Sequence, residues 1–178
     1  MSDINNSSTL ARRLREELQG EVLFDRFNRG RYSTDASIYQ LMPIGVVLPK
    51  SDDDVEAAIK IAKEEGIPVL PRGSGTSQNG QAIGEALLID TTRHLNQIID
   101  FDRENQTACV QPGLVLDHLN RYLKPHGLFY PVDVSTANRA TLGGMTGNNS
   151  CGARSIRYGN MVHNVLSVEA LLANGSKA

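Results

Sequence analysis

PVLPRGSGTSQNGQ, residues 68–81, is the stretch that decides the fold, because it puts a glycine-rich loop directly after an apolar run. Gly73, Gly75 and Gly80 stand among hydroxyl and amide side chains. Glycines let a backbone take positive φ and approach a ligand closely, and hydroxyl groups add hydrogen-bond donors. On composition alone, a phosphate-binding loop and a plain connection are equally well supported.

Two common nucleotide-binding motifs do not match this loop. The dinucleotide motif G-x-G-x-x-G fails because Gln78 stands where the third glycine is required. Gly75 and Gly80 have the spacing of a P-loop, but Gln81 and Ala82 follow in place of Lys-Ser/Thr. Without that lysine we do not expect nucleotide hydrolysis.

The residues before the loop predict a strand–helix–strand unit. GVVLP (45–49) and IPVLP (67–71) are short apolar runs typical of buried strands. Between them, SDDDVEAAIKIAKEEG (51–66) predicts a helix with Ser51 as N-cap and acidic residues in its first turn. Such a unit implies parallel strands. Further upstream, residues 9–19 predict an amphipathic helix and residues 26–43 an irregular segment.

The residues after the loop predict a second, more antiparallel part. ALLIDTT (86–92), QIIDFD (97–102) and TACVQPG (107–113) are strand candidates at short spacing, and residues 114–127 predict a helix. VLSVEALLANGS (165–176) predicts a strand that runs into an Asn-Gly hairpin turn. Because few residues follow that turn, we expect a fragment of a longer protein, with an unpaired strand edge that invites self-association.

A second glycine-rich region, TLGGMTGNNSCGARSIRYG (141–159), carries five glycines. Two such loops, each tied to regular elements, suggest a large ligand held between two walls. A dinucleotide fits that arrangement better than a single phosphate does.

Composition excludes several other classes of function. The net charge of −2 and 40% hydrophobic residues are ordinary for a globular protein and indicate neither nucleic-acid nor anionic-membrane binding. Cys109 and Cys151 cannot by themselves form a zinc site or an iron–sulfur cluster, so we expect no metal. The start is polar and no apolar run reaches the ~20 residues of a membrane span, which favours a cytoplasmic protein.

The chain resembles a known family of flavoproteins. Residues 46–84 and 112–175 resemble the FAD-binding domain of the p-cresol methylhydroxylase and vanillyl-alcohol oxidase superfamily, and the resemblance runs from about residue 32 to the end. The closest similarity is to FAD-linked 2-hydroxyacid dehydrogenases of the D-lactate, glycolate and D-2-hydroxyglutarate types. NNSCGARSIRYG (148–159) most resembles large bacterial members that carry an iron–sulfur region after the flavin part.

The resemblance implies an α+β fold of the p-cresol methylhydroxylase type. A small parallel βαβ subdomain (about 32–92) and a mixed or antiparallel subdomain (93–178) would hold FAD between them, after an N-terminal helix and extension (1–31). The cofactor-binding residues that it implies lie in the first loop, in the segment 131–136 and in the second loop. They are Pro71, Arg72, Gly73, Ser74, Gly75, Thr76, Ser77, Asn79, Gly80, Pro131, Ser135, Thr136, Thr141, Gly143, Gly144, Asn148, Asn149, Ser150, Gly152 and Tyr158. Residues 165–171 resemble the strand that reaches the adenosine.

The resemblance also implies a division of labour. The flavin would take a hydride at N5 from a D-2-hydroxyacid. The resemblance places the substrate-binding base in a later cap domain, so no catalytic residue is assigned here. The isolated chain would therefore be inactive. The first loop holds no histidine, and FAD is expected to bind non-covalently. Two alternatives are an empty, non-catalytic FAD-binding module and a relative of UDP-N-acetylenolpyruvoylglucosamine reductase. An iron–sulfur region or an electron-transfer partner would belong to the full-length protein.

Several single residues allow two interpretations. Arg72 either pairs with a phosphate or braces the loop, with equal support. For Cys151, a small packing residue is favoured over a flavin–cysteine bond, and for Asp133, capping a turn is favoured over contacting a ribose. Tyr158 either packs on the cofactor or belongs to the core. His163 is a weak candidate near the second loop.

Overall fold

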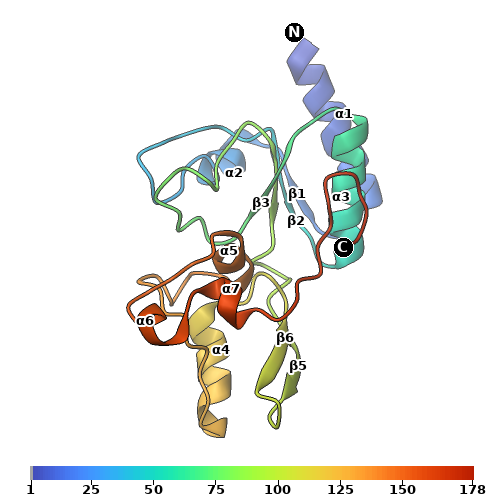
Figure 1. The fold of residues 1–178 in the computed structure, drawn as a ribbon. Helices are drawn as coiled ribbons and strands as arrows, with labels where there is room; N and C mark the ends of the chain where they lie inside the picture. The colour runs from blue at the N-terminus through green and yellow to red at the C-terminus, as the bar shows by residue number, and fades with distance from the viewer. Residues whose placement is uncertain (1) are drawn as a thin grey trace.

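The computed structural model describes residues 2–178, with side chains from residue 9 onward; Met1, the first residue of the predicted extension, lies outside the described residues. A four-stranded sheet forms one half of the molecule (Figure 1). Its strands, in order across the sheet, are β1 (Glu21–Leu23), β2 (Gly45–Leu48), β4 (Leu87–Asp90) and β3 (Val69–Arg72).

The sheet confirms the predicted parallel strands and corrects their arrangement. β2 and β3 each run parallel to β4, which lies between them, while β1 is antiparallel to β2. The prediction that residues 86–92 belong with an antiparallel part was wrong. All four residues of β4 are buried, and a strand buried on both faces belongs in the middle of a parallel sheet.

Two helices pack side by side against one face of this sheet (Figure 1). α3 (Asp52–Glu64) begins as predicted, with the Ser51 hydroxyl accepting a hydrogen bond of 3.3 Å from the N–H of Asp54. α1 (Ser2–Glu17) begins earlier than the predicted residue 9 and buries Leu10 and Leu14 in the core below the sheet. The first core therefore includes residues from the N-terminal extension.

The segment 26–43, predicted as irregular, contains a helix. α2 (Arg26–Arg31) is capped by Asp25, whose carboxylate accepts a 3.0 Å hydrogen bond from the N–H of Asn28. None of the helix residues is buried, so the sequence has no apolar stripe from which this helix could be predicted.

The second half of the molecule is built on an antiparallel hairpin, as predicted. β5 (Ile98–Asp102) pairs with β6 (Thr107–Val110), and α4 (Leu116–Leu123) continues into the 3₁₀ turn η1 (Lys124–His126). The second glycine-rich region folds into two short helices, α5 (Leu142–Gly147) and α6 (Ser155–Tyr158). A third, α7 (Met161–Asn164), follows directly after it. A second core of buried residues, including Leu119, Val132 and Met161, lies among these elements.

The C-terminal segment corrects another prediction. Residues 165–176 form no strand; a single bridge joins Leu171 to Lys177 instead. The predicted turn is present, with Gly175 at φ +87°, and the chain returns far enough for Leu172 to donate a 2.9 Å hydrogen bond to Ser176. This short hairpin lies beside α3 (Figure 1), with a 3.2 Å ion pair between Lys177 and Glu56. The predicted unpaired hairpin strand is therefore not observed.

No helix in the described part of the chain combines the length and the apolar character that crossing a membrane requires.

Candidate functional site

The first loop, residues 73–78, presents a run of unused hydrogen-bond donors. Within the described part of the chain, none of its six backbone N–H groups donates a hydrogen bond to another protein atom. The loop leaves the carboxyl end of β3, at the edge of a parallel sheet where ligands commonly bind. Successive unpaired N–H groups of this kind are suited to an anion.

Arg72 holds the base of the first loop. Its Nη1 donates to the carbonyl oxygens of Ala82 (2.7 Å) and Tyr32 (3.3 Å), and its Nη2 donates to that of Thr34 (2.9 Å). Of the two interpretations of Arg72, these contacts favour the brace. On the other side of the loop, the Gly75 carbonyl accepts a 3.1 Å hydrogen bond from the N–H of Ala36.

A polar cluster behind Arg72 was not found from the sequence. The Tyr32 hydroxyl donates a 2.7 Å hydrogen bond to the buried carboxylate of Asp90, and Thr92 donates to the second carboxylate oxygen. Burial and the nearby Asp90 charge raise the pKa of Tyr32 well above its ordinary value. Burial lowers the pKa of Arg72, although Asp90, Tyr32 and Asp35 oppose that effect. The only sequence signal was the position of Asp90 at the end of an apolar run.

The two glycine-rich loops touch each other. The Ser74 hydroxyl donates a hydrogen bond to the carbonyl oxygen of Arg139, just before the second loop (141–159). A side chain at Gly73 would collide with that of Thr141, which is buried and caps α5. The residues that the sequence singled out in the two regions are therefore neighbours in space.

The second loop differs from the first because most of its N–H groups are already used. Gly143 donates to the Pro112 carbonyl (2.9 Å), and Gly152 donates to the Ser155 hydroxyl (3.0 Å). Asp133 accepts a 2.9 Å hydrogen bond from the N–H of Arg154 and so joins the segment 131–136 to the second loop. The second loop is thus an internally braced wall, with few free donors for an anion.

The amide side chains of the second loop are also engaged. Asn148 donates a 3.0 Å hydrogen bond to the Gly144 carbonyl, and Asn149 accepts one of 3.0 Å from the N–H of Val162. His163, the weak candidate, accepts a 3.0 Å hydrogen bond from the N–H of Asn160 and so caps α7.

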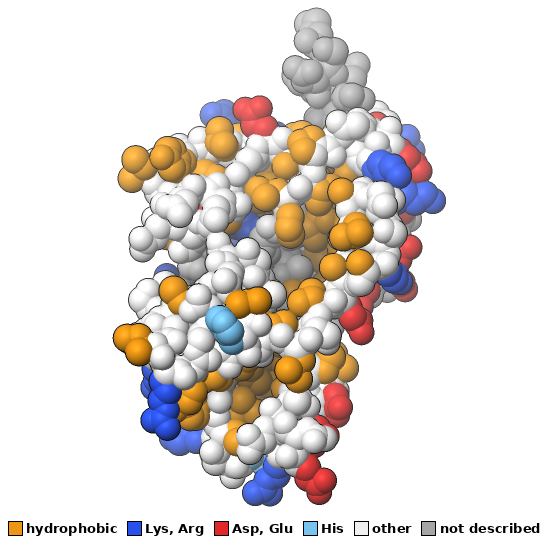
Figure 2. Space-filling view, viewed as in Figure 1, with side chains coloured by type: hydrophobic (Ala, Val, Ile, Leu, Met, Phe, Trp, Pro, Cys, Tyr) orange, Lys and Arg blue, Asp and Glu red, His pale blue; other side chains and the backbone are white. Residues whose placement is uncertain are grey.

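Each loop borders one cavity. A cavity of about 410 Å³ lies beside the first loop, lined by Ala36, Ser37, Ile38, Tyr39, Gln78 and Asn79. A cavity of about 420 Å³ lies beside the second, lined by Thr146, Asn149, Val162, Val165, Leu166, Ser167 and Val168. Figure 2 shows the face over α5 and α7, where uncharged and hydrophobic side chains fill the middle and most charged side chains lie toward the edge. The surroundings suit an elongated, largely uncharged ligand with an anionic centre.

Several predicted residues are more exposed than expected. Cys151 is exposed, so the interpretation of it as a buried packing residue was wrong. Tyr158 is also exposed, which excludes a core role; its ring meets that of Phe129 edge-on at 5.8 Å between centroids. In the segment 131–136, Ser135 is exposed and Thr136 is half-buried.

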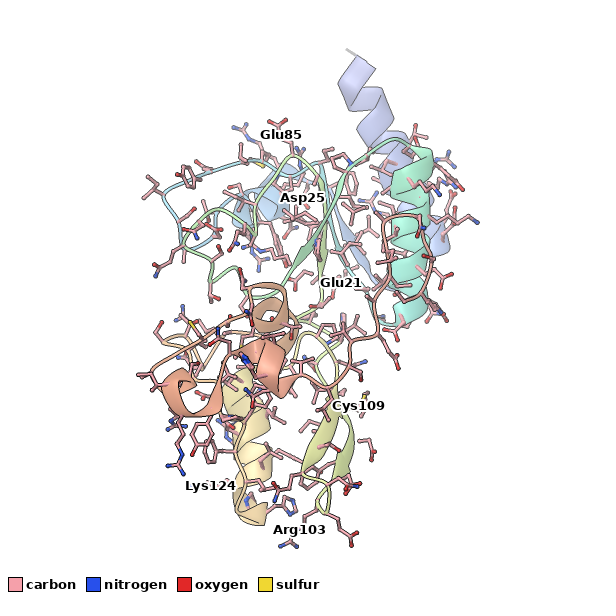
Figure 3. The ribbon with its side chains drawn as sticks, in the orientation of Figure 1. Glu21, Asp25, Glu85, Arg103, Cys109 and Lys124 are labelled. Atoms are coloured by element: carbon pink, nitrogen blue, oxygen red, sulfur yellow. The ribbon has the colours of Figure 1, made fainter. Side chains whose placement is uncertain are left out.

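The remaining titratable groups form no second site. Among the described residues, no three His, Cys, Asp or Glu side chains gather as a metal site. Glu21, Asp25, Glu85, Arg103 and Lys124 lie scattered over both halves of the molecule (Figure 3). Cys109, the other free thiol, is exposed on β6 (Figure 3).

The chain is similar to known proteins over most of its length. Over 159 residues the chain is 42% identical to D-2-hydroxyglutarate dehydrogenase of Escherichia coli (strain K12), which covers 88% of this chain and 16% of that protein. Over 163 residues it is 40% identical to the glycolate oxidase subunit GlcD of Bacillus subtilis (strain 168), which covers 89% of this chain and 35% of that one. The chain therefore spans only a minor part of the length of these relatives.

A solved structure shows the same fold. An alkyldihydroxyacetonephosphate synthase superimposes with a TM-score of 0.84 at 23% sequence identity, over 94% of this chain and 37% of that one. This confirms the predicted α+β fold, with its parallel βαβ part and its antiparallel part. A family model described as FAD binding domain matches residues 43–177. With that match over most of its length, the chain belongs to the FAD binding domain family, and FAD is its cofactor.

Proposed function

We propose that the first loop binds the pyrophosphate of FAD and that the chain is the cofactor-binding part of a flavin-dependent oxidoreductase. The observation that carries this proposal is the run of six unpaired N–H groups at residues 73–78. A pyrophosphate is the dianionic centre of FAD, and oriented backbone N–H groups stabilise such a charge without a basic side chain. The hydroxyl group of Thr76 adds a donor at the same place, whereas that of Ser77 already donates a 2.8 Å hydrogen bond to the side-chain oxygen of Gln81.

The surroundings of the first loop fit a dinucleotide. A Cβ at Gly73 would collide with the Thr141 hydroxyl, so the second loop approaches the N–H groups of the first loop directly. The cavity lined by Thr146, Asn149, Val162 and residues 165–168 would take the adenosine end. Its largely apolar lining, with one amide side chain, is typical of a site for a heteroaromatic ring.

The site residues in this proposal are those that the family resemblance implied. The first wall of the site is formed by Pro71–Ser77, Asn79 and Gly80. It is bordered by Pro131, Ser135 and Thr136. The second wall is formed by Thr141, Gly143, Gly144, Asn148, Asn149, Ser150, Gly152 and Tyr158. Arg72 is included in this set because it supports the first loop, and not because it contacts the cofactor itself. FAD would bind non-covalently: the first loop contains neither histidine nor cysteine, and Cys151 is the single thiol in the second loop, so the denaturation experiment below tests a bond to it.

We further propose that the full-length protein oxidises a D-2-hydroxyacid. FAD, when bound, accepts a hydride equivalent from the carbon that carries the substrate hydroxyl. The relatives named above are a D-2-hydroxyglutarate dehydrogenase and a glycolate oxidase subunit, so both names point to small 2-hydroxyacids. The base and the carboxylate-binding groups would lie outside these 178 residues. An iron–sulfur region or electron-transfer partner would take the electrons onward, in the cytoplasm.

This proposal implies a domain organisation. Residues 1–31 would be an extension, and residues 32–178 the FAD-binding domain, divided at about residue 92 into two subdomains. The separate sheets on either side of that boundary support the division.

Titration of the purified chain with FAD tests the cofactor site. We expect quenching of the flavin fluorescence at one FAD per chain, and the yellow colour should separate from the protein on denaturation. A folded chain that leaves FAD fluorescence unchanged would contradict the site, and colour retained after denaturation would contradict non-covalent binding. A panel of D-2-hydroxyacids with the full-length protein tests the substrate class, and the isolated chain should turn over none of them.

A further inference from the structure

Arg72 is enclosed by backbone on several sides. Three of the five N–H groups of its guanidinium donate to carbonyl oxygens, two from the segment 32–34 and one from Ala82. Gly75, at φ +66°, lies against the other side: a Cβ there would come within 2.9 Å of the Arg72 Cζ. The guanidinium therefore joins the segment between β1 and β2 to Gly75 in the first loop and to Ala82 just beyond it.

The position of the guanidinium is itself fixed from behind. It lies over the ring of Tyr32, with Cζ 5.3 Å from the ring centroid. The Tyr32 hydroxyl is held at 2.7 Å by the buried Asp90. Asp35 adds a negative charge nearby and accepts from the N–H of Ala82 at 3.5 Å. These contacts compensate the burial of the cation.

A loop with unpaired N–H groups is stabilised by any other conformation in which those groups bond to water or to a protein carbonyl. Such a loop therefore tends to leave the conformation that binds a ligand. A loop that leaves six such groups unpaired needs a brace, since ligand binding would otherwise have to supply the free energy of ordering the loop. Arg72 occupies the base of the loop, and the hydrogen bond from Ala36 to the Gly75 carbonyl holds its middle.

We propose that Arg72 is a positioning residue: it holds residues 73–78 in the shape that presents their N–H groups, and it does not bind phosphate through its own charge. This inference rests on the proposed function, because the shape matters for cofactor binding only if these donors receive the FAD pyrophosphate.

FAD affinity of Arg72→Lys and Arg72→Gln separates a brace from a phosphate ligand. Lysine keeps the charge, but as a point charge it cannot serve three carbonyl groups with a planar fork. We therefore expect both variants to weaken FAD binding by a similar factor, about tenfold or more. Arg121→Gln, which removes an exposed charge on α4, is the matched control and should bind like the wild type.

Two results would overturn the inference. If Arg72→Lys binds FAD like the wild type while Arg72→Gln does not, the charge of Arg72 acts on the phosphate. If Arg72→Gln binds like the wild type, the loop needs no brace. Tyr32→Phe is a milder variant that keeps the ring under the guanidinium and loses the bond to Asp90, and it should weaken FAD binding less than either Arg72 variant.

Hydrogen exchange in the absence of FAD tests the brace independently of the cofactor. The amide of Ala36, bonded to the Gly75 carbonyl, reports the position of the loop. We expect it to exchange at least several-fold faster in Arg72→Gln, while the amide of Met145, bonded to the Thr141 carbonyl in α5, keeps its rate. An unchanged Ala36 rate would refute the brace. Failure of the wild type to bind FAD would instead refute the proposed function and leave this exchange experiment decisive.

Discussion

Substitution of Gly73 by alanine should destabilise the protein by pushing the two loops apart. An ideal Cβ at this position would collide with the hydroxyl oxygen of Thr141 and would lie 3.6 Å from its Cβ and 3.7 Å from its Cγ2. Thr141 is only 2% exposed, and its hydroxyl accepts the hydrogen bond from the N–H of Gly144 that caps α5. The hydroxyl therefore cannot move away without losing its cap. Overpacking of this kind costs about 1–3 kcal/mol, and we expect about 2 kcal/mol.

A double-mutant cycle with Thr141→Ala tests that cause directly. The single change Thr141→Ala removes the cap and should cost about 1 kcal/mol. It also removes the atoms that an alanine at position 73 would strike, so Gly73→Ala should then cost less than about 0.5 kcal/mol. The coupling between the two sites is thus expected to be about 1.5 kcal/mol, near the middle of the range for residues in contact.

The assay is urea unfolding of the four proteins, with the free energy of unfolding taken from linear extrapolation. Gly147→Ala is the matched control: it lies in the same short helix, and a Cβ there would meet nothing within 4 Å. It should be neutral or stabilising, because alanine is the better helix former. Additive costs in the cycle, or a Gly73→Ala variant as stable as the wild type, would show that the two loops are not in the contact described here.

Three further changes test the surroundings of the site. Ser74→Ala removes the hydroxyl that bonds to the carbonyl before the second loop, and should lower the free energy of unfolding by about 1 kcal/mol in urea. Asp54→Ala leaves the N–H groups of Gln19 and Lys50 without their carboxylate acceptor (2.8 Å each), and should cost about 2 kcal/mol or more in the same assay. Burial raises the pKa of Tyr130 to about 12, whereas an unfolded tyrosine ionises near pH 10. The contribution of Tyr130 to the free energy of unfolding is therefore complete below about pH 10 and is lost as the pH rises toward 12. Thermal melts from pH 8 to 12 should fall less steeply for Tyr130→Phe, and parallel curves would contradict this.

Elements with strong local signals were predictable from the sequence. The helix after Ser51 has an N-cap, an acidic first turn and an apolar stripe at Ala58 and Ala62, and the structure confirms all three. The two strands around it are confirmed as parallel. Local propensity, capping and patterning point to the same answer there, which is the condition under which a short stretch specifies its own structure.

Other elements depend on partners that lie far away in the chain. α2 buries no residue, so nothing in its sequence repeats at helical spacing. The predicted strand at 165–176 has the right composition, but among the described residues it pairs through a single bridge, with Ala170 and Leu172 bonded to Ala178 and Ser176. A regular strand needs a longer run of such partners for its backbone groups. Residues 86–92 read as one more short strand, and only the complete sheet shows that they lie between β2 and β3.

The candidate site shows the same limit at the level of single residues. The sequence could mark both loops as glycine-rich, but glycine serves different purposes in them. In the first loop, Gly75 takes a left-handed conformation beside the guanidinium of Arg72, and the N–H groups around it stay free. In the second, Gly143 and Gly152 let the backbone approach Pro112 and Asp133, and their N–H groups are used within the protein.

Composition therefore could not separate the loop that presents donors from the loop that supports it. That distinction depends on where each N–H group points, and tertiary contacts fix this direction. Replacing a glycine that faces a buried neighbour, such as Gly73 against Thr141, should lower the free energy of unfolding even if the cofactor is never bound. A residue such as Arg72 can be replaced without collision, and its loss should be felt first in FAD binding. Stability and affinity measured on the same variants will therefore distinguish the two kinds of residue.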